Sequence, residues 1–336
     1  REYVRWAGKR GSGEAGRRRD SRGPAGRTQT RQARKPKRTS GAQNFELTRF
    51  PASPLPPIDR TPKLYIGGKQ ARPDSGYSLA VRGRDGKHIG EVGQGNRKDI
   101  RNAVESAHQA AGWAQTTAHG RAQVLYYLAE NLAARAEEFA GRLASLSSDA
   151  AAARREVELS IERIYSYAAW ADKYDGAVHH TPFRNVTLAM PEPIGVLGIV
   201  SPDEYPLLGF LSTLFPALAM GNTVVAIPSE TAPLAATDFY QVLDTSDVPA
   251  GVVNIVTGAR DELAKILAAH DDVDGIWYFG NQETSAEVER LSAGNMKRTW
   301  VSLGESRDWA DALAGEGEEF LEQATQVKNI WIPYGE

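Results

Sequence analysis

The feature that most constrains the fold is a regular alternation of apolar and amphipathic segments between residues 195 and 303. The apolar segments have the length of buried strands and lie at 195–200, 223–227, 252–256, 275–278 and 298–303. The segments between them have helical spacing and lie at 207–220, 232–243, 260–269 and 282–292. Strands that are apolar on both faces and separated by helices predict a parallel sheet covered on both sides. Because crossovers between parallel strands are right-handed, we expect an α/β fold with a doubly wound, Rossmann-like sheet and helices on both faces.

The region before this alternation predicts short strands, then helices, then one longer strand. A short strand with a turn is expected at 63–69 and a hairpin at 77–92. One helix is expected to begin at an N-cap at Asp99. A second helix is expected at about 119–146 and a third at about 153–175. A further strand is expected at 183–190, just before Pro191.

The first 62 residues differ in composition from the rest of the chain. Residues 1–50 hold 15 Lys and Arg against 4 Asp and Glu, whereas the whole chain has a net charge of −2. The stretch 9–42 has almost no apolar residue and is predicted to be disordered, and the Pro-rich stretch 51–62 indicates a semi-rigid spacer. We therefore interpret this region as a basic linker. Contact with nucleic acid is less favoured, because no aromatic residue interleaves the charges from Lys9 to Arg38. A tail without function and an out-of-frame stretch are the remaining alternatives.

The chain contains no cysteine. This excludes disulfides, thiolate metal sites and cysteine nucleophiles within the chain, and it fits a reducing compartment such as the cytoplasm. No apolar run approaches the ~18 residues of a membrane helix, so no membrane contact is expected. The adjacent His179 and His180 would point to opposite sides of an extended strand, which disfavours a shared metal ion. No metal site is expected.

Four stretches of the sequence form a characteristic combination. They are 64–69 (LYIGGK), 193–202 (PIGVLGIVSP), 215–225 (FPALAMGNTVV) and 252–258 (VVNIVTG). Together they resemble the aldehyde dehydrogenase superfamily, and the resemblance spans about 63–336. It implies a cofactor-binding core at 193–304 and an oligomerisation-type strand at 183–190. It also implies a catalytic domain that would follow and that is missing from this chain.

The positions to which the resemblance assigns catalysis carry unsuitable residues. Glu204 stands where the family has an Asn that holds the oxyanion, and a carboxylate there would repel the developing negative charge. Ser302 stands at the position of the general base, which requires a carboxylate. Residues 324–336 have the spacing of the segment that leads to the catalytic cysteine, but they end at Glu336 without a cysteine. We therefore expect no catalytic residue, with Glu204, Ser302 and Glu336 as degenerate positions.

The cofactor-binding positions implied by the resemblance are preserved in part. They are Pro202, Ser229, Glu230, Gly258 and Gly280. Ile227 replaces a ribose-binding Lys, and Ser285 replaces the second glycine of the turn that begins at Gly280. A lone glycine at a strand-to-helix turn is weak evidence for phosphate binding. We therefore expect no cofactor, with NAD or NADP as the alternative.

Within the superfamily, the chain most resembles the second, degenerate unit of the two-unit aldehyde dehydrogenases of family sixteen. Residues 1–8 would then be a remnant of a preceding unit, and 63–336 a pseudo-unit. The leading hypothesis is a non-catalytic structural unit that contacts a preceding or partner aldehyde dehydrogenase unit and forms a homo-oligomer through 183–190. The alternatives are the front part of an active NAD(P)-dependent aldehyde dehydrogenase and an adenine-nucleotide-binding module.

Overall fold

The structure is a computed structural model that describes residues 61–334. These residues belong to one compact unit, Ile58–Glu336. The expected linker, apart from residues 61–62, and the expected remnant at 1–8 lie outside the described residues.

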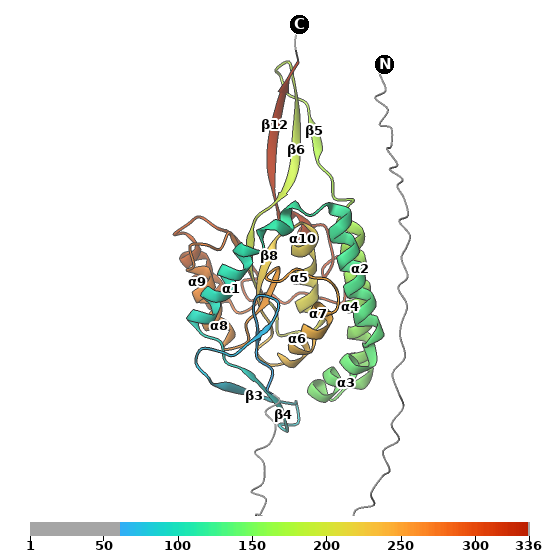
Figure 1. Cartoon of the computed structure of the whole chain (residues 1–336), viewed down its shortest axis with the longest axis vertical. Helices are drawn as coiled ribbons and strands as arrows, with labels where there is room; N and C mark the ends of the chain where they lie inside the picture. Colours follow the sequence, from blue (N-terminus) through green and yellow to red (C-terminus); the bar gives the residue numbers. More distant parts are fainter. Residues whose placement is uncertain (1–60, 335–336) are drawn as a thin grey trace, which may run out of the picture. The chain divides into compact units, whose positions relative to one another are not determined.

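A seven-stranded sheet forms the centre of this unit, with the strand order β11-β10-β7-β8-β9-β1-β2 (Figure 1). Its parallel part consists of β7 (Val196–Val200), β8 (Thr223–Ile227), β9 (Val253–Ile255), β10 (Gly275–Tyr278) and β11 (Arg298–Val301). The expected α/β fold with a doubly wound parallel sheet is therefore confirmed. Two short strands, β1 (Leu64–Tyr65) and β2 (Gln70–Ala71), continue the sheet in antiparallel orientation beyond β9, so that the whole sheet is mixed.

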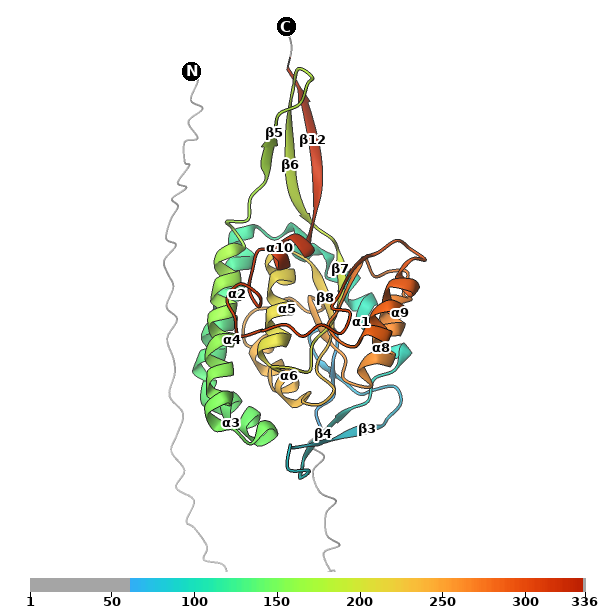
Figure 2. The same cartoon turned by 180° about the vertical axis from the view of Figure 1, so that it is seen from behind.

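Helices cover both faces of the sheet (Figures 1 and 2). On one face lie α2 (Ala118–Ala134), α3 (Ala136–Ser147), α4 (Ala150–Trp170), α5 (Leu208–Ala219), α6 (Leu234–Asp238) and α7 (Tyr240–Asp244). On the other face lie α1 (Arg97–Gln109), α8 (Arg260–Ala268) and α9 (Gln282–Ser292). Each face has its own apolar core: Leu197 and Ile199 of β7 belong to the first, and Val196 and Val200 to the second. This explains why the strands are apolar on both sides.

A hairpin completes the body of the unit. The strands β3 (Ser78–Arg82) and β4 (His88–Gly93) form the expected hairpin, which packs against Leu146 of α3 and Leu234 of α6. Among residues 61–334, no helix combines the length and the hydropathy that crossing a bilayer requires.

Several helix boundaries differ from the sequence-based expectation. The N-cap of α1 is Asn96, whose side chain accepts the backbone N–H groups of Lys98 and Asp99 at 2.8 and 3.3 Å. The carboxylate of Asp99 accepts the backbone N–H of Asn96 in return at 3.0 Å, so that Asp99 is the third helical residue of a capping box. The helix expected at 119–146 is divided at Arg135, and that expected at 232–243 is divided at Phe239. Neither residue is a helix breaker by type, so composition does not reveal these breaks.

A three-stranded antiparallel sheet projects from the body, with the order β12-β6-β5 (Figures 1 and 2). Its strands are β5 (Ala177–His179), β6 (Asn185–Pro193) and β12 (Thr325–Pro333). The strand expected at 183–190 is present as β6. Because β6 ends at Pro193 and β7 begins at Val196, the projecting sheet adjoins the amino end of the parallel strands.

Residues 325–333 do not lie at the ligand end of the sheet, contrary to the interpretation based on the spacing of the segment 324–336. After α10 (Glu319–Gln323), β12 pairs with β6 from Thr325 opposite Pro193 to Pro333 opposite Asn185. In doubly wound sheets the ligand site lies at the carboxyl ends of the strands, which is the opposite end of the sheet. Glu336 itself lies outside the described residues. The spacing was misleading because a strand's partner far away in sequence leaves no local signature.

A buried carboxylate connects two helices near the carboxyl ends of the strands. Glu156 of α4 accepts the backbone N–H groups of Leu207 and Leu208 at 2.8 and 3.1 Å, where α5 begins without a cap of its own. The side chain therefore satisfies donors that a helix start leaves free. Burial raises the pKa of Glu156, and the two N–H groups oppose this effect.

We expect the substitution Glu156→Gln to remove a pH-dependent part of the stability. With a folded-state pKa above the ordinary value of 4.5, Glu156 holds its proton in the folded state where the unfolded chain has released it. Its contribution to the free energy of unfolding is therefore largest below that value and declines as pH rises through the raised pKa. Glutamine keeps the acceptor oxygen and has no charge. Urea unfolding at acidic and neutral pH should show wild type losing stability relative to the variant, and parallel profiles would contradict the assignment.

Candidate functional site

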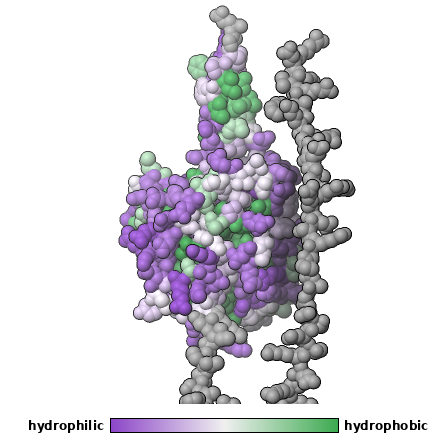
Figure 3. All heavy atoms as spheres, in the orientation of Figure 1, coloured by the Kyte–Doolittle hydropathy of each residue, from purple (hydrophilic) through white to green (hydrophobic). Residues whose placement is uncertain are grey.

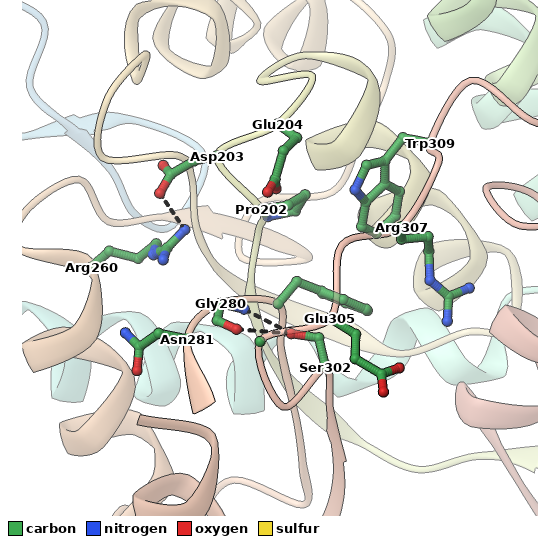
Figure 4. Close-up of a pocket in the computed structure, with 12 residues that line it drawn as sticks. Pro202, Asp203, Glu204, Arg260, Gly280, Asn281, Ser302, Glu305, Arg307 and Trp309 are labelled. Atoms are coloured by element: carbon green, nitrogen blue, oxygen red, sulfur yellow. Dashed lines mark hydrogen bonds and ion pairs between the residues drawn. The ribbon is translucent and has the colours of Figure 1, made fainter. Parts of the chain in front are cut away.

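The strand order creates a crevice at a defined place in the sheet. From β7 the chain proceeds to β8 and β9 on one side, and later to β10 and β11 on the other. The loops after β7 and β10 therefore diverge, and ligands of such sheets bind at this switch point. A pocket of about 210 Å³ lies there, lined by Pro202, Asp203, Glu204, Arg260, Phe279, Gly280, Asn281, Ser302, Gly304, Glu305, Arg307 and Trp309 (Figure 4).

The structure brings together some of the residues singled out in the sequence and separates others. Pro202, Glu204, Gly280 and Ser302 all line the pocket. The cofactor positions Ser229, Glu230 and Gly258 are not among the lining residues. Gly258 has a φ of +158°, and a Cβ there would lie 2.8 Å from the side chain of Leu263, so this glycine serves the packing of α8.

Ser302 connects the turns that follow β10 and β11. Its hydroxyl accepts the backbone N–H of Gly280 at 3.1 Å and donates to the carbonyl oxygen of Gly280 at 3.0 Å (Figure 4). Both hydrogen-bonding roles of the hydroxyl are thus used to fix the Gly280 turn. At this position the side chain supports the pocket wall, and it has no carboxylate that could take a proton from water.

An ion pair that the sequence-based reasoning missed lies in the pocket wall. The guanidinium of Arg260, at the start of α8, lies 2.7 Å from the carboxylate of Asp203, which follows β7 (Figure 4). Asp203 also accepts the Ser229 hydroxyl at 2.7 Å and the Glu230 backbone N–H at 3.1 Å. Arg260 and Asp203 are far apart in sequence, and their pairing depends on β7 and the α8 start meeting at one end of the sheet.

Carboxylates also organise the first turns of the two helices beside the pocket. Glu230 accepts the backbone N–H of Arg260 at 2.8 Å, which caps α8. Asp261 accepts the Tyr278 hydroxyl and the Asn281 amide, each at 2.7 Å, and so connects α8 to the start of α9. Burial and the neighbouring Asp261 raise the pKa of Tyr278 to about 12, which keeps this hydroxyl a proton donor.

An aromatic wall closes the other side of the pocket. The guanidinium of Arg307 lies over the rings of Trp300, Trp309 and Phe320, with 5.2 Å to the centroids of Trp300 and Phe320. The fully buried Arg163 of α4 holds the segment 309–316 by hydrogen bonds to the carbonyl oxygens of Trp309 and Gly315. This segment, which follows β11 and precedes α10, is therefore packed as part of the body.

The fold and the pocket define a class of protein. A doubly wound parallel sheet with a polar crevice at its switch point, beside the starts of two helices, is typical of nucleotide-binding α/β domains. The aldehyde dehydrogenase family model matches residues 75–308, and the chain belongs to this family.

Relatives and solved structures of known identity support this assignment. The chain is 36% identical over 247 residues to hydroxyisobutyraldehyde dehydrogenase of Mycolicibacterium austroafricanum, and the aligned region covers 72% of this chain and 49% of that protein. It is 33% identical over 255 residues to cytosolic 10-formyltetrahydrofolate dehydrogenase of Mus musculus, and the aligned region covers 72% of this chain and 28% of that protein. The crystal structure of Staphylococcus aureus betaine aldehyde dehydrogenase in complex with NAD⁺ shares the fold, with a TM-score of 0.69 and 24% identity over 74% of this chain and 52% of that chain. The chain thus spans about half, or less, of the length of these three proteins.

The expectation that no cofactor is bound is contradicted by these comparisons. Structural neighbours of this chain are aldehyde dehydrogenases, and several of them were solved in complex with NAD⁺. That expectation was based on the Lys replaced by Ile227 and the second glycine replaced by Ser285. In the folded chain the pocket at the switch point is present despite these replacements.

The residues of the pocket fit the phosphate part of such a cofactor. Gly280 lies at the turn before α9, where a Cβ would clash with the Tyr278 side chain and would lie 2.9 Å from a terminal nitrogen of Arg260, so that only a glycine lets these two side chains approach the turn. A guanidinium beside a glycine turn at a helix start is the chemistry that phosphate groups select.

Proposed function

We propose that this chain is an NAD(P)-binding, non-catalytic unit of an aldehyde dehydrogenase-type protein, of the kind represented by the second unit of the two-unit enzymes. The observation that carries the proposal is the Ser302 clamp on Gly280. At the position of the family's general base, the Ser302 hydroxyl holds the Gly280 turn of the pocket wall and cannot act as a general base. The pocket is supported while the reactive groups are replaced.

In this proposal the residues of the chain bind and orient a nicotinamide dinucleotide. Pro202, Gly280 and Arg260 would line its path, and the Glu230 cap would keep the start of α8 in place. The bound cofactor would supply a hydride acceptor. The chain has no cysteine, so it lacks the thiolate that would bind an aldehyde covalently next to that acceptor.

The charges of the pocket support a non-catalytic role. Glu204 and Glu305 line the pocket, and both are exposed. A negative charge at Glu204 disfavours an oxyanion at the position that the family uses for it. The loss of nucleophile, base and oxyanion donor together favours a structural role over aldehyde oxidation by these residues.

We further propose that the projecting sheet mediates assembly. Residues that pair across antiparallel strands share a face, and on one face Val178, Leu188 and Ile330 are neighbours, as are Val186 and Ile332. Four of these side chains are 38% to 72% exposed: Val178, Val186, Ile330 and Ile332. Figure 3 shows apolar residues gathered on this projection. An exposed apolar sheet face of this kind favours a second copy of the chain, or a partner aldehyde dehydrogenase unit, as its cover.

A second candidate function has support from the same pocket. The chain could be the front part of an active NAD(P)-dependent aldehyde dehydrogenase, in which a longer polypeptide or a partner subunit supplies the nucleophile. The open pocket at the switch point favours this alternative, as does the limited share of its relatives' length that the chain spans.

A cytoplasmic location and the division into a linker at 1–62 and a unit at 63–336 stay predictions.

Binding without turnover is the expected result when the intact chain is mixed with NAD⁺ or NADP⁺ and a panel of aldehydes. At a ligand concentration of about one hundred times Kd, bound cofactor should stabilise the fold by ~2.7 kcal/mol, measured by thermal or urea unfolding. Reduced nicotinamide, followed by its absorbance, should not form. Formation of reduced cofactor would reject the non-catalytic proposal in favour of the active fragment. Absence of any stabilisation by either dinucleotide would reject cofactor binding.

A further inference from the structure

A second pocket lies where α3 packs beside the β3–β4 hairpin (Figures 1 and 2). Its volume is about 300 Å³, and its walls come from the hairpin, α3, α4 and the loops that follow β7 and β8. The apolar side chains in its lining are Leu143, Leu146, Pro206 and Ala232. A concave site with apolar walls and a few polar groups is suited to a small molecule, and the polar groups select which one.

The most buried polar side chain in this lining is the carboxylate of Glu156, which is 9% exposed. Its Oε1 accepts the backbone N–H groups of Leu207 and Leu208. Its Oε2 has no hydrogen-bond partner among residues 61–334, and no cation of this range forms an ion pair with it. Burial of a carboxylate without a cation is costly, and burial raises the pKa of Glu156 accordingly. A cationic ligand in the pocket would remove this cost.

The other charged groups of the pocket have partners or are exposed. Asp203 forms the ion pair with Arg260 at 2.7 Å. Arg82 and Arg84 belong to the hairpin and are exposed, and Arg82 donates to the Gly86 carbonyl oxygen at 3.2 Å. Water and salt screen exposed charges of this kind. Glu156 is therefore the charged group that determines which ligand fits the pocket.

We propose that this pocket binds a small primary amine, whose ammonium group donates to Oε2 of Glu156 and whose alkyl chain lies against Leu143, Leu146 and Ala232. An ammonium supplies both the positive charge and the donor that Oε2 lacks, whereas a hydroxyl of the same size supplies only the donor. None of these four residues lines the pocket at the switch point. The inference therefore goes beyond the proposed function and does not depend on cofactor binding.

Isothermal titration calorimetry of the intact chain with n-alkylamines, from propylamine to hexylamine, tests this site at constant ionic strength. The alcohols of equal chain length are the neutral probes. Wild type should bind an amine of the series at least about tenfold more tightly than the matching alcohol. Glu156→Gln keeps an acceptor oxygen for the α5 start but removes the charge, so it should abolish this preference. The matched control is Glu158→Gln on the same helix, where the side chain is 63% exposed, and it should bind as wild type does.

A second variant fills the pocket and leaves the carboxylate in place. Ala232 is 9% exposed and lies in the lining, so the longer side chain of Ala232→Met should occupy the space of the alkyl chain. Amine binding should then weaken by at least about tenfold. Circular dichroism establishes that each variant is folded, and should Glu156→Gln be unfolded, Ala232→Met decides.

The outcomes either support or overturn the site. Loss of the amine preference in Glu156→Gln, with wild-type binding in Glu158→Gln, supports it, as does weaker binding in Ala232→Met. Failure of wild type to bind any amine of the series in a saturable way overturns it. An unchanged preference in Glu156→Gln, equal loss in both glutamine variants, or unchanged binding in Ala232→Met also overturns it. Binding of NAD⁺ is measured in a separate titration, so failure of the amine site leaves the proposed function standing.

Discussion

Substitution of Ile330 by Asp should dissociate the assembly that we propose for this chain. Ile330 lies in the middle of β12, opposite Leu188 of β6, on the face of the projecting sheet that carries Val178, Val186 and Ile332. If a second copy covers this face, each interface would bury an unpaired carboxylate. Burial of an unpaired charge costs several kcal/mol, so the dissociation constant should rise by at least about a hundredfold. Analytical ultracentrifugation over a range of concentrations measures this change.

The neighbouring residue provides a matched control. Asn329 precedes Ile330 in β12, so its side chain points to the other face of the sheet, and it is exposed. Asn329→Asp adds the same charge at almost the same place and should leave the assembly intact. If Ile330→Asp assembles as wild type does, this face is not the interface. Equal dissociation of both variants would indicate a general charge effect.

Substitution of Arg163 by Met should cause a large loss of stability. Arg163 is 1% exposed and contacts Ser212 at 2.6 Å, the Trp309 carbonyl oxygen at 3.1 Å and Glu316 at 3.0 Å. Methionine fills a similar volume but leaves a carboxylate and carbonyl oxygens without their partner. Removal of one member of a buried ion pair costs about 3–5 kcal/mol. The free energy of unfolding from urea denaturation measures this loss.

The same helix contains an exposed arginine that serves as the control. Arg154 forms an ion pair with Glu137, and the two side chains are 63% and 79% exposed. Arg154→Met should change stability by less than about 1 kcal/mol, because exposed ion pairs contribute little. A loss of less than about 1 kcal/mol for Arg163→Met would show that the segment 309–316 is held by its aromatic contacts instead.

Local sequence patterns predicted the central sheet well and the connections between distant segments poorly. The strands β7, β8 and β10 lie where their apolar runs indicated, since a buried parallel strand must be apolar on both faces. Helix α1 begins three residues earlier than predicted. Both Asn96 and Asp99 are suitable as N-cap by residue type, and the capping box uses both of them. The same limitation applies to the pocket. Pro202, Gly280 and Ser302 follow strand ends and were visible in sequence, whereas the Arg260–Asp203 pair required two loops to meet.

The sequence by itself determined the layered α/β architecture, membership of the aldehyde dehydrogenase family, and the absence of cysteine from this chain. These properties depend on residue type and on spacing over a few turns of chain, which are present before folding. The tertiary structure alone decided that β12 pairs with β6 and that Arg260 meets Asp203 beside Gly280. Both depend on contacts between segments far apart in sequence, whose free energy is realised when the whole sheet has brought them together.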